Sequence, residues 1–243
     1  CRREARPPSQ EVTVKASSCS ACSARKACLL TSQLSPEEIE ASKGIRHIRS
    51  YEGRQTLFHE GMPALGIHIL CSGRVKLSRG DNHGRQQILR IVGPGEICGE
   101  EALLEGTPYM STAEALESCQ TAFVRREAFL DLLQNRDRII LPLLRHICQV
   151  LIETQIRLTR VALSDARTRM AAQLLELAQR HGRPGPSGIT LQLGLRRGEL
   201  AALAGLSPET AMRLLSQFQR EGLLEVHGRR LTIKAPERLR ALL

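Results

Sequence analysis

Short apolar segments separated by glycines run from residue 45 to residue 124. They read TLF, GIHIL, RVKL, QILRIV and TAFV, and glycines recur between them. Apolar and polar side chains alternate along several of these segments, which is typical of strands with one buried face. Short strands with regular glycine turns indicate an antiparallel sandwich or barrel over residues 45–135.

The apolar period becomes helical from about residue 139. Seven positions follow alternating steps of four and three residues, namely Ile140, Leu144, Ile147, Leu151, Thr154, Leu158 and Val161. A stripe of this kind over three heptads predicts a helix over 136–164 that pairs with a second copy of the chain. A helix buried inside one chain shows a similar stripe, but the flanking arginines, Arg145, Arg157 and Arg160, favour a homodimer.

The remaining residues, 165–243, have the pattern of a winged helix-turn-helix. The expected elements, in chain order, are a helix over 166–180, a surface loop at 181–187, a short strand at 189–193, helices over 197–204 and 208–221, and a hairpin over 223–233. Gly205 permits the turn between the last two helices. The hairpin forms the wing.

In such motifs the start of the second helix contacts base edges in the major groove. The outer face here presents Glu209, Met212 and Arg213, where Arg213 suits guanine O6 and N7 and Glu209 suits cytosine N4. A helical hairpin with a solvated face is the alternative, but it leaves the wing unexplained. The full set expected to contact DNA is Ser207, Glu209, Thr210, Met212, Arg213 and, on phosphates, Arg229 and Arg230.

The net charge of +10 on 243 residues is unevenly distributed. Residues 1–30 carry +4, residues 31–153 carry −2 and residues 154–243 carry +8. The basic excess coincides with the predicted helix-turn-helix and favours double-stranded DNA over a membrane or an acidic protein as the partner. We find no run of about 18 apolar residues and no apolar signal-peptide core, so we expect a cytoplasmic protein without a membrane span.

Three cysteines lie close together near the N-terminus, at Cys19, Cys22 and Cys28. Thiolates at this spacing are natural ligands of zinc and of iron–sulfur clusters. The chain has eight cysteines and no export signal, which favours reduced thiols over disulfides. Ser35 followed by Pro36 predicts the start of a helix. Residues 1–44 are therefore expected to form a cysteine-containing sensor segment.

Motifs along most of the chain resemble those of the CRP/FNR transcription regulators. They are EGRQTLFHEG (52–61), ILCSGRVKL (69–77), GPGEICGEEALL (93–104), AEALES (113–118) and LAGLSPETAMRLLSQFQREGLLEV (203–226). The resemblance implies an α+β fold with an N-terminal antiparallel β-roll of the cyclic-nucleotide-binding kind, a long dimerisation helix and a C-terminal winged helix-turn-helix.

The cysteine spacing resembles that of the FNR branch. There, three N-terminal cysteines and one distant cysteine hold a 4Fe–4S cluster, and loss of the cluster in oxygen weakens the dimer and its DNA binding. The branch's fourth cysteine aligns with Ala122. Cys119 lies three residues earlier, on the other face of a regular strand, where a bulge could turn it. We expect Cys119 to be the fourth ligand, with Cys98 as the alternative, and Cys71 and Cys148 to be core or seam thiols.

Two departures from the family pattern concern ligand and operator. Nucleotide-binding members use a Gly-Glu pair and a later Arg-Ser/Thr pair, but here Gly99-Glu100 is followed by Tyr109-Met110-Ser111, so no cAMP is expected. Pro208 stands where members that read TGTGA have arginine, which resembles the FNR branch and its TTGAT half-sites. Met212 replaces the serine usual in that branch.

The resemblance implies a homodimeric regulator, an activator, that binds a palindromic operator, contacts RNA polymerase and senses oxygen or redox state through an iron–sulfur cluster. In the alternatives the cysteines bind zinc, with His47 or His59 as a further ligand, or act as a thiol switch, or His59 or His68 ligates haem. We find no glycine-rich phosphate loop, HExxH motif or nucleophile elbow, so an enzyme is not expected.

Overall fold

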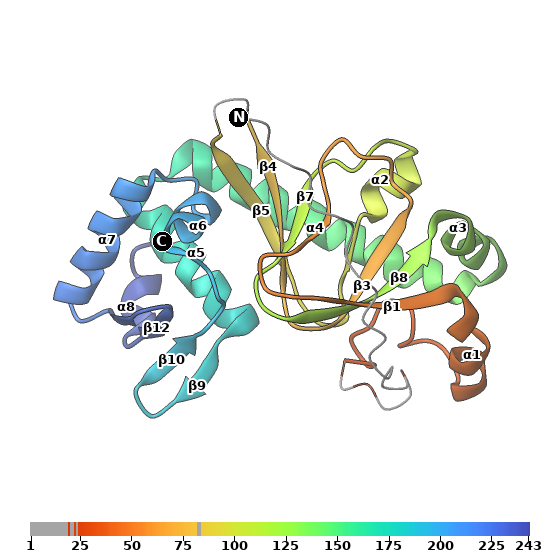
Figure 1. The fold of residues 1–243 in the computed structure, drawn as a ribbon. Coiled ribbons are helices and arrows are strands. Elements are labelled where there is room, and N and C mark those ends of the chain that lie inside the picture. The colour runs from red at the N-terminus through yellow and green to blue at the C-terminus, as the bar shows by residue number, and fades with distance from the viewer. Residues whose placement is uncertain (1–18, 20–21, 23, 82–83) are drawn as a thin grey trace.

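The structure, a computed structural model, describes residues 19, 22, 24–81 and 84–243. A β-domain and a C-terminal domain lie side by side, and one long helix runs along both (Figure 1). This is the fold class expected from the sequence, so that prediction is confirmed.

Two antiparallel four-stranded sheets form the β-domain. The first has the order β1-β8-β3-β6 and contains β1 (Arg46–Tyr51), β8 (Cys119–Arg125), β3 (Gly66–Ser72) and β6 (Ile97–Cys98). The second has the order β2-β7-β4-β5 and contains β2 (Thr56–Phe58), β7 (Thr112–Ala115), β4 (Val75–Gly80) and β5 (Gln86–Val92). The five segments picked out by apolar alternation all contribute strands, whereas β1, β6 and β7 were not predicted.

The side chains of the first sheet alternate between two cores. Leu70, Cys98 and Cys119 belong to the core shared with the second sheet. Ile69 and Ala122 belong to the opposite core, where residues 28–30 cover the first sheet. The pairing of β3 with β8 shifts register between Leu70 and Ser72, so Cys71 occupies a β-bulge and packs partly buried against this opposite core.

Four short helices flank the sheets. They are α1 (Pro36–Ala41), the 3-10 helix η2 (Lys43–Ile45), α2 (Glu100–Glu105) and α3 (Arg126–Asn135). Ser35 and Glu38 form the capping box of α1, with Ser35 Oγ accepting from the Glu38 amide at 3.2 Å. The predicted start of this helix is therefore confirmed. Helices α2 and α3 were not predicted.

Helix α4 (Asp137–Leu163) links the two domains. Only Ile139 and Leu143 are buried, whereas every apolar position of the predicted stripe is exposed, up to 68 % at Leu158. By length and composition alone this helix could also cross a membrane, although polar residues such as Arg145 and Gln149 interrupt it, so it contains no unbroken run of 18 apolar residues. Its high apolar content comes from the dense apolar face, which a second copy of the chain would also cover.

The C-terminal domain contains four helices and one antiparallel sheet, of order β11-β12-β10-β9. Its elements are α5 (Ala166–His181), β9 (Arg183–Gly185), β10 (Gly188–Leu191), α6 (Arg197–Leu203), α7 (Pro208–Arg220), β11 (Leu224–His227), β12 (Arg230–Ile233) and α8 (Pro236–Arg240). The predicted loop at 181–187 is partly wrong, because Arg183–Gly185 pairs with β10 as a strand. The helix α8 was not predicted.

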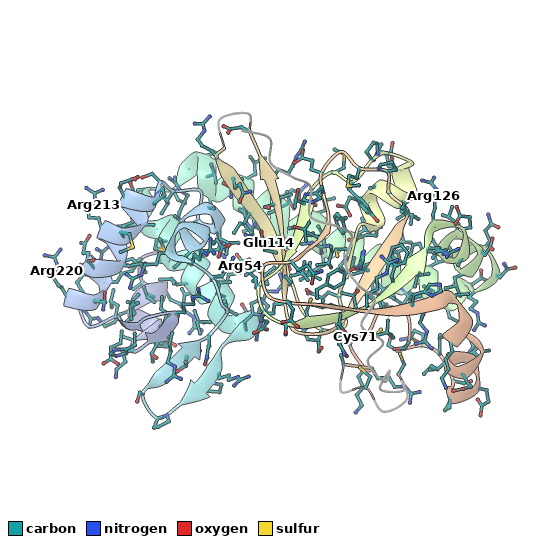
Figure 2. All side chains as sticks on the ribbon, in the orientation of Figure 1. Arg54, Cys71, Glu114, Arg126, Arg213 and Arg220 are labelled. Atoms are coloured by element: carbon teal, nitrogen blue, oxygen red, sulfur yellow. The ribbon has the colours of Figure 1, made fainter. Side chains whose placement is uncertain are left out.

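The two domains share a core and a polar network. Ile88, Ile91 and Leu116 of the β-domain pack in the same cluster as the C-terminal helices. Beside them, Glu199 of α6 accepts from Lys76 Nζ at 2.6 Å and from Arg54. Figure 2 shows Arg54 and Glu114 at this boundary. Helix α6 of the helix-turn-helix is therefore held directly against the β-domain.

Candidate DNA interface and cysteine site

Helix α7 is positioned by a cap and an apolar face. Ser207 Oγ accepts from the Thr210 amide at 3.2 Å, and Pro208 occupies the first turn. Four apolar residues fix the inner face, namely Ala211, Leu214, Leu215 and Phe218. The opposite face consequently points outward, and Figure 2 shows Arg213 and Arg220 projecting from it into solvent.

The residues expected to contact bases differ in whether their side chains are exposed and in whether they already have a hydrogen-bond partner. Glu209 and Arg213 are exposed on α7. Ser207 and Thr210 are engaged with each other at the cap, where their hydroxyl oxygens lie 3.1 Å apart. Met212 is half-buried, and its Sδ lies 3.7 Å from Arg197 Nη1. The geometry therefore leaves Glu209 and Arg213 as the side chains best placed to contact base edges.

The wing adds cations to the same side of the domain. Arg229 and Arg230 are exposed at the tight turn between β11 and β12, where Gly228 has a φ of 59°. They line a hollow together with Arg196 and Arg197 from the start of α6. Sequence reasoning missed Arg196, Arg197 and the exposed Arg220. The adjacent arginines before α6 were a visible signal, but only the fold shows that they meet the wing.

The cysteine triplet lies against the outer face of the first sheet. Cys19, Cys22 and Cys28 line one hollow with Cys71 of β3, Ala122 of β8 and Arg46 of β1. The Leu29 amide donates to the Gly95 carbonyl at 3.2 Å, which ties the segment to the β-domain. Figure 2 shows Cys71 at this face of the sheet. The structure therefore brings a fourth thiol to the triplet.

That fourth thiol is not the one expected. Cys98 and Cys119 are buried between the two sheets, in the core that does not contain Cys28. The register shift in the pairing of β3 with β8 lies beside Cys71 and leaves Cys119 facing the core between the sheets, whereas Cys71 lies on the same face of β3 as Ile67 and Ile69. Cys71, expected to be a core or seam thiol, instead lines the hollow, whereas Cys148 is exposed on α4.

The environment of the hollow is apolar and tightly closed. Burial, and then the neighbouring Cys19, Cys22 and Cys28, raise the pKa of the Cys71 thiol to about 12. Arg46 donates to Cys19 Sγ and also, at 2.6 Å, to the Ile39 carbonyl. Only about 20 Å³ of free space remains between the lining residues. A bound group would therefore require the triplet segment to move outward.

The donor set is one that both an iron–sulfur cluster and a zinc ion use. Cysteine sulfurs are the only metal-binding side chains in the lining, which is the soft set that such clusters use. Among the residues that the structure describes, no three His, Cys, Asp or Glu side chains lie close enough to hold one ion. His47 and His59 are exposed elsewhere and His68 is buried beside Phe58, so none of these three candidate histidines joins the hollow.

Comparison with known proteins gives the same architecture. Residues 48–136 match the cyclic nucleotide-binding domain and residues 168–242 match the Crp-like helix-turn-helix domain. The chain is 32% identical over 184 residues to the CRP-like cAMP-activated global transcriptional regulator of Mycobacterium tuberculosis, covering 76% of this chain and 82% of that protein. The chain belongs to the CRP/FNR family of transcription regulators.

Two further relatives of this CRP/FNR chain extend the comparison. The regulatory protein HlyX of Actinobacillus pleuropneumoniae is 26% identical over 221 residues, 91% of this chain and 92% of its own, and a match of that length necessarily includes Cys28. The solved structure of the c-di-GMP responsive regulator CLP of Xanthomonas campestris is 27% identical, with a TM-score of 0.72, and the match covers 82% of this chain and 99% of that one. All three relatives are named as regulators and none as an enzyme.

A hollow between the β-domain and α4 has a charge unlike that needed by a cyclic phosphate. It measures about 440 Å³, and four carboxylates line it, those of Glu100, Glu101, Glu105 and Glu153. Its two guanidiniums are already paired, Arg90 with Glu100 at 3.0 Å and Arg157 with Glu176 at 3.1 Å. Glu153 is paired as well, with Arg180 at 3.0 Å, but Glu101 and Glu105 form no ion pair within the described part of the chain, so an anion placed here would meet their negative charge.

Glu100 illustrates how this hollow is organised. It is the first residue of α2, after Gly99, whose φ of 89° a side chain would strain. His146 Nε2 lies 2.9 Å from Glu100 Oε1. Burial opposes ionisation, but His146 and Arg90 prevail and lower the pKa of Glu100. Glu100 therefore joins the β-domain to α4 through its contact with His146.

Proposed function

We propose that this chain is a homodimeric, DNA-binding regulator whose N-terminal thiols hold a 4Fe–4S cluster, with Cys71 as the fourth ligand beside Cys19, Cys22 and Cys28. The observation that carries the proposal is the convergence of these four thiols on one hollow without any carboxylate or histidine. The match to HlyX adds support, because a match of that length includes Cys28, the last cysteine of the triplet. Oxygen or another oxidant is the proposed signal.

The chain's own contacts connect this site to α4. Leu29 and Leu30 follow the triplet directly and pack in the same core as Ile139 and Leu143 at the start of α4. A bound cluster would supply oxidant-sensitive iron–thiolate bonds. Loss of the cluster would then disturb the packing of Leu29 and Leu30 against the start of α4. A small disturbance is sufficient, because a change of about 1.4 kcal/mol in dimer stability alters the dimerisation constant tenfold.

The exposed stripe of α4 is the proposed dimer seam. Its apolar members are exposed in the single chain, from 36% at Ile147 to 68% at Leu158. Thr154 is the single polar position, and its hydroxyl donates to the Val150 carbonyl at 2.7 Å. Two copies pairing along this seam would place two α7 helices on one side of a palindromic operator. TTGAT-like half-sites and RNA polymerase are the proposed partners there.

Anaerobic purification tests the proposal. The protein is expected to be brown, to contain about four iron atoms and four sulfide ions per chain, and to bind an operator fragment as a dimer. Exposure to air should remove the iron and weaken both dimer and DNA binding. Cys28→Ala should behave, even without oxygen, like the air-exposed protein. A colourless protein that binds DNA equally with and without air would exclude the cluster, but it would not contradict the proposed DNA binding.

The arginine pair before α6 provides a separate test of the DNA interface. Replacing Arg196 and Arg197 together by glutamine should weaken binding to operator and unrelated DNA alike, because phosphate contacts do not depend on sequence. The slope of log K against log salt should fall in magnitude by about 2. Arg138→Gln, at the exposed start of α4, is the matched control. An unchanged slope in the double variant would place these arginines outside the interface.

We also propose that cAMP is not the effector, because paired arginines and four carboxylates line the hollow between the β-domain and α4. Adding cAMP should leave the operator affinity of the protein unchanged. An increase in affinity would show that the carboxylates rearrange or become protonated.

A further inference from the structure

Most of the aromatic side chains in this chain gather at one place in the β-domain. The chain has four phenylalanines, two tyrosines and no tryptophan. Three of these six rings adjoin His68, namely Tyr51, Phe58 and Phe123, and a fourth, Tyr109, adjoins Phe58. Phe58 and Tyr109 stack with centroids 3.9 Å apart, and Phe123 lies 5.0 Å from the His68 ring. So dense a group in an aromatic-poor chain needs an explanation beyond filling a core.

These rings form the wall of a cleft that opens to solvent. Its volume is about 470 Å³, within the range of small-molecule sites. Phe58, Tyr109 and Phe123 line it, and at its rim Met62 is 52% exposed and Leu65 is 69% exposed. We call this the aromatic cleft. It is formed by β1, β8 and the segment between β2 and β3, and it shares no lining residue with the cysteine hollow or the carboxylate-lined hollow.

Three arginines line the aromatic cleft without a carboxylate partner. Arg49, Arg125 and Arg126 form no ion pair within the described part of the chain, whereas Arg74, Arg79 and Arg90 elsewhere in the β-domain do. The guanidinium of Arg49 lies over the Phe123 ring at 4.0 Å, which fixes its position. Figure 2 shows Arg126 at the edge of the β-domain, where α3 begins.

The remaining polar groups of the cleft do not cancel this positive charge. Glu127 is the only acid in the lining, and it is exposed. His68 lies 3.1 Å from Thr121 Oγ1 through Nδ1, and burial, with Arg49 nearby, lowers its pKa to about 3. The histidine ring is therefore neutral at physiological pH and adds a further flat surface. The cleft combines flat apolar walls with cations that have no internal counter-charge.

We propose that the aromatic cleft binds a small organic anion with a flat apolar body, of the aryl carboxylate class. The ring walls match a planar body, which gains from stacking and burial. Guanidinium groups match a carboxylate through paired hydrogen bonds. This site is distinct from the cysteines, and it does not depend on the proposed cluster.

Titration with 1-naphthoate tests the site on the full chain. Because the chain has no tryptophan and both tyrosines adjoin the aromatic cleft, the intrinsic tyrosine emission reports on this site alone. The emission should change in a saturable way. Inorganic phosphate has the negative charge but no flat body, and 1-naphthalenemethanol has the flat body but no charge. Each should bind at least tenfold more weakly than 1-naphthoate, because losing either the charged hydrogen bonds or the stacked ring lowers the affinity roughly tenfold.

Variants identify the residues responsible. Arg126→Gln and Arg49→Gln should each weaken 1-naphthoate binding about tenfold, whereas Arg138→Gln should leave it unchanged. Circular dichroism and the melting temperature of each variant check that it folds. No saturable change with 1-naphthoate, or equal affinity in Arg126→Gln, Arg49→Gln and Arg138→Gln, would overturn the proposal. Equal binding of 1-naphthalenemethanol would overturn the anionic part of it.

Discussion

Cys71→Ala is expected to leave the anaerobically purified protein without iron and sulfide. Cys71 occupies the bulge of β3 and lines the hollow with Cys19, Cys22 and Cys28, and these clusters normally take four protein ligands. Removing one of four thiolates leaves an iron atom open to solvent and oxidant. The effect should be close to complete, measured as iron and sulfide per chain and as visible absorption.

Cys119→Ala and Cys98→Ala are the matched controls for this prediction. Both thiols are buried between the sheets, so each variant removes a cysteine that is more deeply buried than Cys71 but should retain the full iron content. Each should cost about 1 kcal/mol of stability through the small cavity it leaves. Full iron in Cys71→Ala, or loss of iron in Cys119→Ala, would mean that Cys71 is not the ligand and would restore the expectation from sequence.

Glu199→Gln should weaken the contact between the two domains and lower the stability of the protein, while helix α6 stays folded. Glu199 Oε1 accepts from Lys76 Nζ at 2.6 Å, and Lys76 is only 3% exposed, so neutralising the carboxylate leaves a buried ammonium with Glu114 as its remaining partner at 3.2 Å. The loss should be about 2 kcal/mol in the free energy of unfolding. That corresponds to a melting temperature lower by about 4–8 °C. Glutamine can still accept from the Arg196 amide, so the capping box survives.

The same carboxylate predicts a dependence on pH. Burial opposes ionisation of Glu199, but hydrogen bonds from Arg54 and Lys76 lower its pKa from an ordinary 4.5 to about 2. A lowered pKa in the folded state stabilises the fold fully above pH 4.5, and this contribution is lost as the pH falls toward 2. The difference in stability between wild type and Glu199→Gln should therefore shrink over that interval, as measured by urea denaturation.

A solvent-exposed ion pair provides the control for both measurements. Glu60 pairs with Arg79, whose side chain is half exposed, so Glu60→Gln should change the free energy of unfolding by less than about 1 kcal/mol. A loss in Glu199→Gln no larger than in Glu60→Gln would show that the network between the domains does not contribute to stability.

Periodicity in the sequence was sufficient to predict the helices and strands that have one clearly apolar face. The stripe of α4, the two helices of the helix-turn-helix and the alternating strands all lie within a few residues of their predicted bounds. Strand β1 was missed because its sequence, RHIRSY, alternates weakly and most of its residues are only half-buried. Strand β9 was missed because Pro184 and two glycines resemble a loop, although backbone pairing with β10 holds them extended.

The fourth cysteine needed the pairing of two strands as well as alternation within each. Counting faces along β8 correctly placed Cys119 opposite Ala122, and the same counting along β3 puts Cys71 on the face of Ile67 and Ile69. That this face of β3 is also the face of Ala122, against which residues 28–30 pack, follows only from the fold. The meeting of Arg196 and Arg197 with the wing is likewise a property of the folded domain.

Ile147 and Thr154 belong both to the exposed stripe of α4 and to the wall of the carboxylate-lined hollow. Association of two copies along the proposed seam would therefore also cover part of the wall of this hollow in each copy. A small molecule in the hollow would then exchange with solvent more slowly from the dimer than from a single chain.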